Sequence, residues 1–122
     1  AYCQFLGPIS NVEQILSVSD VYLMSSQVEG LGIAALEAMA SGIPTILTKS
    51  PGLVDLIEKI NGVIGVDASP TTIAEGIIQV ALMSESQRKE LSVNLHHQIR
   101  NTFSMPEGVK NYCNFYRELM TE

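Results

Sequence analysis

The chain contains 122 residues, of which 46% are hydrophobic and 16% are charged. This composition is typical of one small globular domain and excludes a disordered segment. Thirteen acidic and seven basic residues give a net charge of −6, and the scattered basic residues argue against a nucleic-acid-binding surface. No apolar run has the length of a membrane span and we find no leader-like pattern, which predicts a cytoplasmic protein.

The first residues already have a strand-like pattern and the chain does not begin with Met, so we expect a piece of a longer protein. Its parent is expected in the cytoplasm, with a peripheral position at the inner face of the membrane as an alternative. The two cysteines, Cys3 and Cys113, are expected to be reduced interior residues and not a disulfide.

The order of apolar patterns along the chain predicts strands alternating with helices, followed by helices alone. Strands are expected at residues 2–6, 20–24, 44–48 and 63–66. Helices are expected at about 12–18, 31–41, 53–59, 70–82 and 85–103, and after Ser104. Ser69 and Pro70 provide a cap and a first helical residue, and Ile73, Ile77, Ile78, Ala81 and Leu82 form one apolar face. We therefore expect an α/β fold: a Rossmann-like parallel sheet of about four strands, helices on both faces and a helical C-terminal segment.

Two carboxylates, Glu29 and Glu37, lie eight positions apart between two of the expected strands. Such a unit forms a parallel βαβ crossover, whose ligand site lies where the strand ends and the helix begins. At about 1.5 Å of rise per residue, the carboxylates would be roughly 12 Å apart along a helix axis. This span suits an extended ligand that is rich in oxygen atoms.

The Gly30-Leu31-Gly32 segment lies at the expected helix entrance, where free backbone amides favour an anion and glycines let a phosphate approach closely. On the glycines alone, a tight strand-to-helix turn is the favoured explanation, but the adjacent Glu29 favours a ligand that also carries sugar hydroxyls. Glu37 stands among apolar neighbours in a helix expected to be buried nearly all round. Burial would cost several kcal/mol unless a ribose diol or a buried cation satisfies the carboxylate, and we favour the ribose.

Other reactive side chains indicate little chemistry. His96 and His97 are adjacent, point in different directions on a helix and have no partner at metal-ligand spacing, so a surface pair is favoured over a metal site. Ser25 and Ser26 lack the glycine spacing of a nucleophile elbow, which argues against a hydrolase.

The residues Gly7-Pro8-Ile9, Leu16–Ser26, Glu29–Gly32 and Glu37–Pro44 resemble the C-terminal half of GT-B-fold retaining glycosyltransferases. The similar branch is the large family that contains sucrose synthases and many bacterial lipopolysaccharide, capsule and exopolysaccharide enzymes. Its signature is Glu, seven residues, Glu, then Ala-Met-Ala-x-Gly-x-Pro. The resemblance covers residues 2–82 closely. Leu31 departs from it, because an aromatic residue is commoner there, and we expect this to affect packing more than chemistry.

The resemblance implies a role for each residue of the motif. It assigns Glu29, as the catalytic position, to the transferred sugar of a nucleotide-sugar donor, and Glu37 to the nucleoside ribose. The phosphate or sugar region is assigned to three backbone amides, those of Gly30, Leu31 and Gly32. The segment 50–52 falls where the family often places a loop near the donor, although a plain helix-initiating turn explains it equally well.

The resemblance further implies that the chain, over residues 1–122, is the donor-binding domain of a hexosyltransferase-type enzyme in surface polysaccharide or glycolipid biosynthesis. Its partners would be the nucleotide sugar and, through an N-terminal domain, a sugar or lipid-linked acceptor, with no cofactor, metal or nucleic acid. The family's phosphate-neutralising Arg and Lys precede this region, and Lys49 and Lys59 do not match them. We expect the piece alone to be inactive. The alternative is a non-catalytic nucleotide-binding or regulatory module.

The resemblance also predicts a problem at the sheet edge. The family order is 3-2-1-4-5-6, and the four expected strands correspond to numbers 3 to 6, so Tyr2–Leu6 would stand apart from Val21–Met24. Either Tyr2–Leu6 shifts to pair directly beside Val21–Met24, or a second copy covers the exposed edge. We favour a homodimer, because the first strand's edge stays open even in the compact sheet.

Overall fold

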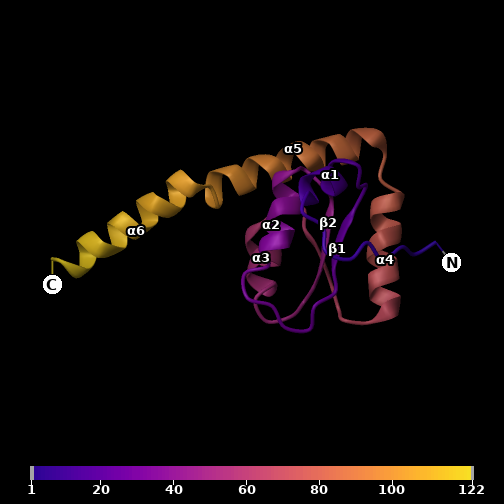
Figure 1. Cartoon of the computed structure of the whole chain (residues 1–122), viewed down its shortest axis with the longest axis horizontal. Coiled ribbons are helices and arrows are strands. Elements are labelled where there is room, and N and C mark those ends of the chain that lie inside the picture. The colour runs from indigo at the N-terminus through magenta and orange to yellow at the C-terminus, as the bar shows by residue number, and fades with distance from the viewer. Residues whose placement is uncertain (1, 122) are drawn as a thin grey trace.

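The computed structural model describes residues 2–121, which form one α/β body with a projecting C-terminal helix (Figure 1). The elements are α1 (Val12–Ser17), β1 (Tyr22–Met24), α2 (Ile33–Ala40), β2 (Thr45–Thr48), α3 (Val54–Lys59), β3 (Ile64–Val66), α4 (Pro70–Ala81), α5 (Glu85–Thr102) and α6 (Met105–Leu119). Helices α2 and α3 lie on one side of the sheet and α4 on the other, which confirms the predicted Rossmann-like α/β class.

The sheet has three parallel strands in the order β1-β2-β3. In its register, Leu23 of β1 lies beside Ile46 of β2, which in turn lies beside Ile64 of β3. The expected fourth strand is wrong, because Tyr2–Leu6 forms no strand and its side chains are exposed. Without buried apolar contacts, nothing offsets the entropy of ordering that segment against the sheet. The outer edge of β1 is therefore unpaired within residues 2–121.

The core lies on both faces of the central strand β2, whose residues are all buried. Successive side chains of a strand point to opposite faces of the sheet. Leu47 therefore packs with residues of α2, α3 and α5, whereas Ile46 packs on the other face with Val66 of β3 and Val80 of α4. Such a strand, buried on both sides, is expected in a parallel sheet covered by helices.

Helix α4 begins as predicted, with the Ser69 hydroxyl accepting a hydrogen bond from the Thr72 amide at 3.2 Å and Pro70 in the first turn. Its buried face differs from the prediction, however. Gly76 and Val80 are buried, whereas the expected face residues Ile77 and Ile78 are exposed. The absence of a side chain at Gly76 lets α4 approach the sheet closely, since a Cβ there would lie 3.1 Å from Val66.

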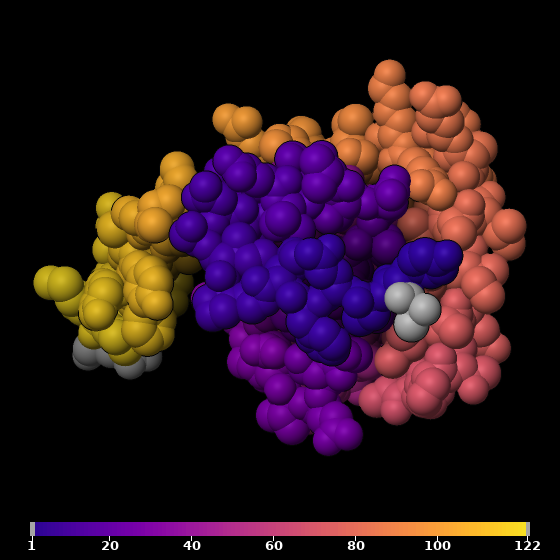
Figure 2. All heavy atoms as spheres, turned by 45° about the vertical axis from the view of Figure 1, so that its right-hand side comes forward, coloured from indigo at the N-terminus to yellow at the C-terminus, as the bar shows by residue number. Residues whose placement is uncertain are grey.

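Helix α6 projects from the body (Figure 2). It buries none of its side chains, and its large apolar residues are exposed. Cys113 on this helix and Cys3 near the other end are free and exposed, so the expectation that both are interior residues is wrong. Within residues 2–121, no helix has the length and apolarity needed to cross a membrane.

Candidate functional site

Glu29 lies in the loop that follows the carboxyl end of β1, four residues before α2 begins. Its side chain is half-buried, and its Oε2 accepts a hydrogen bond of 3.1 Å from the Ser26 hydroxyl. Because Glu29 precedes the helix, its separation from Glu37 is not set by helical rise, and the expected spacing along one axis does not apply. The position itself is the one predicted, where ligands bind parallel sheets.

The loop that follows β2 lies directly against Glu29. The amide of Glu29 donates a hydrogen bond of 3.1 Å to the Pro51 carbonyl. Gly52 has a φ of +87°, and a Cβ on it would collide with the carbonyl oxygens of Glu29 and Gly30. The segment 50–52 is therefore more than a turn that starts α3, because it packs against the loop that carries the candidate carboxylate.

The two glycines before α2 differ in what the fold requires of them. Gly32 has a φ of +67°, is buried, and a Cβ on it would lie only 2.7 Å from a Leu53 methyl. Its conformation and packing therefore demand glycine. Gly30 is exposed, has no left-handed φ, and a Cβ on it would meet nothing within 4 Å. Leu31 between them is also exposed. Packing thus explains Gly32 and leaves Gly30 open to a ligand.

Glu37 is exposed, so the prediction that it sits in a helix buried nearly all round is wrong. Helix α2 buries only Ala35, Ala38 and Met39 and leaves Ile33 uncovered, because no other described element covers its outer face. The Glu37 carboxylate has no hydrogen bond or ion pair within residues 2–121. It lines a hollow of about 800 Å³ between α1 and the second half of α2. Glu29 does not line this hollow.

The phenol of Tyr22 reports on both carboxylates. Burial raises the pKa of Tyr22 above its ordinary value, and the negative charges of Glu29 and Glu37 raise it further. Burial removes water that would solvate the phenolate, and a carboxylate nearby repels it. The two candidate residues therefore act on one side chain of β1, although they line no common hollow.

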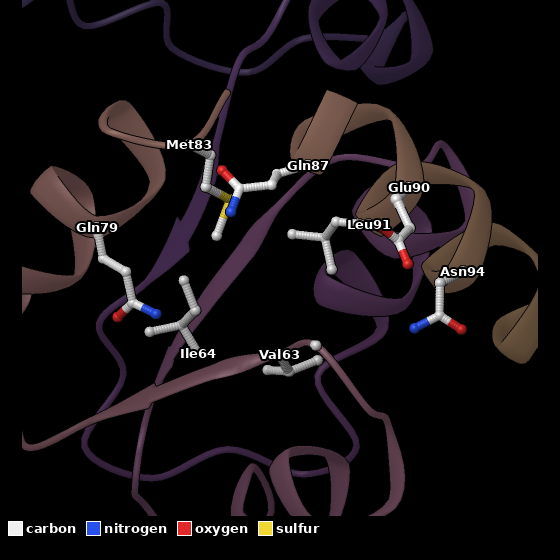
Figure 3. A pocket seen from close by; sticks show the side chains of 9 residues that line it. Val63, Ile64, Gln79, Met83, Gln87, Glu90, Leu91 and Asn94 are labelled. Atoms are coloured by element: carbon white, nitrogen blue, oxygen red, sulfur yellow. The ribbon is translucent and has the colours of Figure 1, made fainter. Parts of the chain in front are cut away.

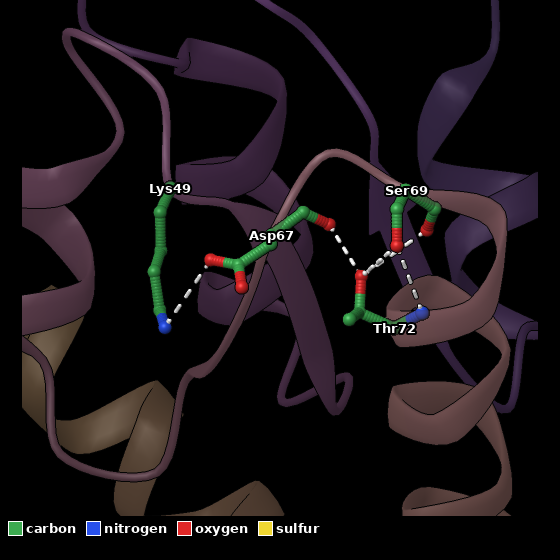
Figure 4. Close-up of polar contacts among 4 residues, drawn as sticks. All are labelled: Lys49, Asp67, Ser69 and Thr72. Atoms are coloured by element: carbon green, nitrogen blue, oxygen red, sulfur yellow. Dashed lines mark hydrogen bonds and ion pairs between the residues drawn. The ribbon is translucent and has the colours of Figure 1, made fainter.

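At the carboxyl end of β3, the polar contacts are structural (Figure 4). Lys49 is 3.5 Å from Asp67, and both side chains are largely exposed. The Thr72 hydroxyl donates to the Asp67 carbonyl at 2.6 Å, beside the Ser69 cap. Lys49 therefore pairs with an acidic neighbour across the ends of β2 and β3.

A second hollow of about 400 Å³ opens between β3, the end of α4 and the start of α5 (Figure 3). It contains none of the predicted site residues. Two of its amide side chains serve the fold, since Gln87 accepts from the Ser84 amide at 2.8 Å and Asn94 donates to the Asn61 carbonyl at 3.2 Å. These two amides therefore hold α5 and the loop before β3 in place, and the hollow lies apart from the residues of the candidate site.

The histidines also serve the fold. Nδ1 of His96 contacts the Ala40 carbonyl, which ties α5 to α2, and His97 lies 3.0 Å from the Asn101 side chain. Among residues 2–121 we find no group of three or more His, Cys, Asp or Glu side chains that could hold a metal ion.

Sequence reasoning did not identify the residues that hold Glu29 in place. Ser26 bonds to its carboxylate, and Thr48, fully buried at the end of β2, donates to the Ser26 carbonyl at 2.6 Å. One signal could have found them: both are polar residues at the ends of apolar runs, and the carboxyl ends of parallel strands meet at one edge of a sheet.

The fold and the position of Glu29 and Gly30 define a Rossmann-like domain with its candidate site at the strand ends. Residues 1–98 match the family described as glycosyl transferases group 1. The chain belongs to that family, which confirms its resemblance to a GT-B glycosyltransferase domain.

Individual relatives are similar over nearly the whole chain. N-acetyl-alpha-D-glucosaminyl L-malate synthase of Bacillus anthracis is 29% identical over 119 residues, which cover 97% of this chain and 31% of that protein. The O-antigen biosynthesis glycosyltransferase WclY of Escherichia coli is 28% identical over 118 residues, covering 97% and 32%. Sucrose-phosphate synthase of Thermosynechococcus elongatus superposes with a TM-score of 0.81 at 22% identity, covering 97% and 30%. The chain spans about a third of the length of these two curated relatives.

Proposed function

We propose that this chain is the donor-binding part of a retaining glycosyltransferase. The enzyme would transfer a sugar from a nucleoside diphosphate sugar to an acceptor hydroxyl, in surface polysaccharide or glycolipid biosynthesis. Family membership supports the reaction class, and the O-antigen relative supports the type of pathway.

One observation carries the proposal. A carboxylate, Glu29, and an unhindered glycine, Gly30, follow the end of β1 and lie against the loop that follows β2. Parallel sheets bind their ligands at this end, and an unhindered backbone lets a phosphate or sugar approach closely. The packing of the fold accounts for Gly32 but gives no reason for glycine at position 30.

The two carboxylates take different parts of the donor in this proposal. Glu29 accepts hydrogen bonds from hydroxyls of the transferred sugar, while Ser26 donates to its other oxygen. Glu37, exposed and without a partner in the described residues, accepts from the ribose diol. The amides of Gly30, Leu31 and Gly32 face the phosphate or sugar region.

The acceptor site and the groups that neutralise the departing diphosphate would lie in parts of the enzyme that correspond to the regions of its relatives outside the matched third. Catalysis would rest on positioning the donor and stabilising the departing phosphate, without a bound metal. The chain by itself is therefore expected to show no transferase turnover and to bind nucleotide sugars weakly.

Titrations followed by nuclear magnetic resonance test this function, because they measure dissociation constants in the millimolar range. The chain is titrated with UDP-, GDP- and ADP-sugars and with the matching nucleoside diphosphates. Glu37→Ala should weaken binding of both ligand types, whereas Glu29→Ala should remove only the gain contributed by the sugar.

Three results would contradict the proposal. Failure of every nucleotide sugar to bind would remove the donor site. Equal binding of nucleotide and nucleotide sugar would favour a nucleotide-binding regulatory module. Equal losses for both ligands in both variants would overturn the division of roles between Glu29 and Glu37.

A further inference from the structure

The carboxyl end of β2 anchors the loop that carries Glu29. Thr48 is fully buried, and its hydroxyl lies 2.6 Å from the Ser26 carbonyl and 3.4 Å from the Met24 carbonyl. A hydroxyl has one proton to donate, and the shorter contact identifies Ser26 as its acceptor. This bond crosses from one strand end to the next, between residues that are 22 positions apart in the chain.

The same loop residue then holds the carboxylate. Ser26 is half-buried, and its hydroxyl donates to Oε2 of Glu29 at 3.1 Å. The backbone of Ser26 is thus fixed by Thr48 while its side chain fixes Glu29. A long, flexible Glu side chain otherwise samples several rotamers, and the entropy of ordering it would be lost when a ligand binds.

A second set of contacts holds the backbone of Glu29, whereas the bonds through Ser26 hold its side chain. Its amide bonds to the Pro51 carbonyl, and Gly52 packs against its carbonyl oxygen. These contacts fix where the Glu29 backbone lies but leave its side chain free to rotate. Among the described residues, only the chain of bonds from Thr48 through Ser26 reaches the carboxylate itself.

We propose that Thr48 is a positioning residue, which acts through Ser26 to hold the Glu29 carboxylate in the orientation that binds the transferred sugar. This inference rests on the proposed function, because it presupposes that Glu29 meets the sugar. Thr48 itself touches no ligand, since its side chain is fully buried.

The chain offers a matched control on the same strand. Thr45 is also fully buried, and its hydroxyl donates to a backbone carbonyl, that of Ile43, at 2.8 Å. It lies at the opposite end of β2, away from Glu29. Thr45→Val and Thr48→Val therefore remove the same kind of hydrogen bond from the same strand, while Thr48→Ser keeps the hydroxyl.

The first measurement needs no ligand. Three-bond couplings report the side-chain rotamers of Glu29 in the whole chain. We expect one dominant rotamer in the wild type, Thr45→Val and Thr48→Ser, and averaged couplings in Thr48→Val. A single rotamer in Thr48→Val, or equal averaging in Thr45→Val, would overturn the positioning role whatever the ligand is.

The second measurement compares a nucleotide sugar with its own nucleoside diphosphate. The probe is the tightest-binding member of the UDP-, GDP- and ADP-sugar panel. Thr48→Val should reduce the affinity gain from the sugar about fivefold, the loss expected for one hydrogen bond. Thr45→Val should leave that gain unchanged, and Thr48→Ser should restore it.

A double-mutant cycle separates this inference from the function on which it rests. In the Glu29→Ala background, Thr48→Val should have no further effect on the gain from the sugar. If Glu29→Ala itself leaves the gain intact, the proposed function fails. If Glu29→Ala removes the gain but Thr48→Val does not reduce it, the function stands and the positioning role fails.

Discussion

Glu29 and Glu37 belong to one motif, yet the two regions that carry them are built differently. The Glu29 loop is tied to the end of β2 by a hydrogen bond from Thr48 and by close packing against Gly52, and within the loop Ser26 bonds to the Glu29 carboxylate. Glu37 lies on an exposed helix face beside an open hollow. The difference teaches that the fold fixes the Glu29 carboxylate, whereas it leaves Glu37 exposed and unpaired in the described residues.

Adding a methyl group at Gly52 should disrupt the packing of the Glu29 loop and cause the largest loss of stability among these variants. Gly52→Ala combines a left-handed φ of +87° with a collision against two carbonyl oxygens. We expect the unfolding free energy to fall by at least about 2 kcal/mol. Urea unfolding measures it, with Gly108→Ala as the control, because a Cβ there meets nothing within 4 Å. A stable Gly52→Ala variant would show that the two loops are not in contact.

Substitutions at the two glycines before α2 should have different effects, on stability at Gly32 and on ligand binding at Gly30. Gly32→Ala is expected to lower the unfolding free energy by about 1–3 kcal/mol, because it strains the backbone and crowds Leu53. Gly30→Ala should change it by less than about 0.5 kcal/mol but weaken nucleotide-sugar binding. Urea unfolding and ligand titrations of the same samples decide this. Unaltered ligand affinity in Gly30→Ala would remove the reason for assigning that position to the donor.

The Tyr22 phenol, which senses the charges of Glu29 and Glu37, makes the stability of the fold depend on pH. Its pKa in the folded chain is raised above the ordinary value of 10.0, first by burial and then by the two carboxylates. The folded state therefore holds this proton more tightly than the unfolded state does. Its stabilising contribution is present below about pH 10 and is lost as pH rises through the folded pKa.

Unfolding experiments between about pH 8 and about pH 11 should show the stability of the wild type falling more steeply with pH than that of Tyr22→Phe. Glu29→Gln and Glu37→Gln should each shift the Tyr22 titration, followed by its absorbance, toward lower pH. Identical pH profiles for the wild type and Tyr22→Phe would contradict the assignment.

Neutralising Glu37 should have the smallest effect on stability. Glu37→Gln is expected to change the unfolding free energy by less than about 0.5 kcal/mol, because the side chain is exposed and unpaired in the described residues. Glu13→Gln, on the wall of the same hollow, is the control for the loss of one negative charge. A loss above about 1 kcal/mol for Glu37→Gln alone would reveal a structural role that the geometry does not show.

Local signals predicted most of the elements. The apolar patterns placed both ends of α5 within one residue and the start of α6 after Ser104, and the Ser69-Pro70 start of α4 is confirmed. The strand at Tyr2–Leu6 failed because alternation describes a preference, whereas a strand also needs a partner. The predicted face of α4 was wrong because large apolar residues do not mark the buried face: Gly76, which has no side chain, lets the helix approach the sheet closely.

By itself, the sequence determined the α/β class, the family and the place of the candidate carboxylates, because each follows from residue types at short spacings. Only the tertiary structure decided that Glu37 is exposed, that the Pro51–Gly52 segment presses against Glu29, and that Thr48 supports Ser26. These facts depend on which strand ends lie side by side and on which surfaces remain uncovered. Polar residues at the ends of two apolar runs mark Ser26 and Thr48 as strand-end residues, but the bond between positions 22 apart is set by packing.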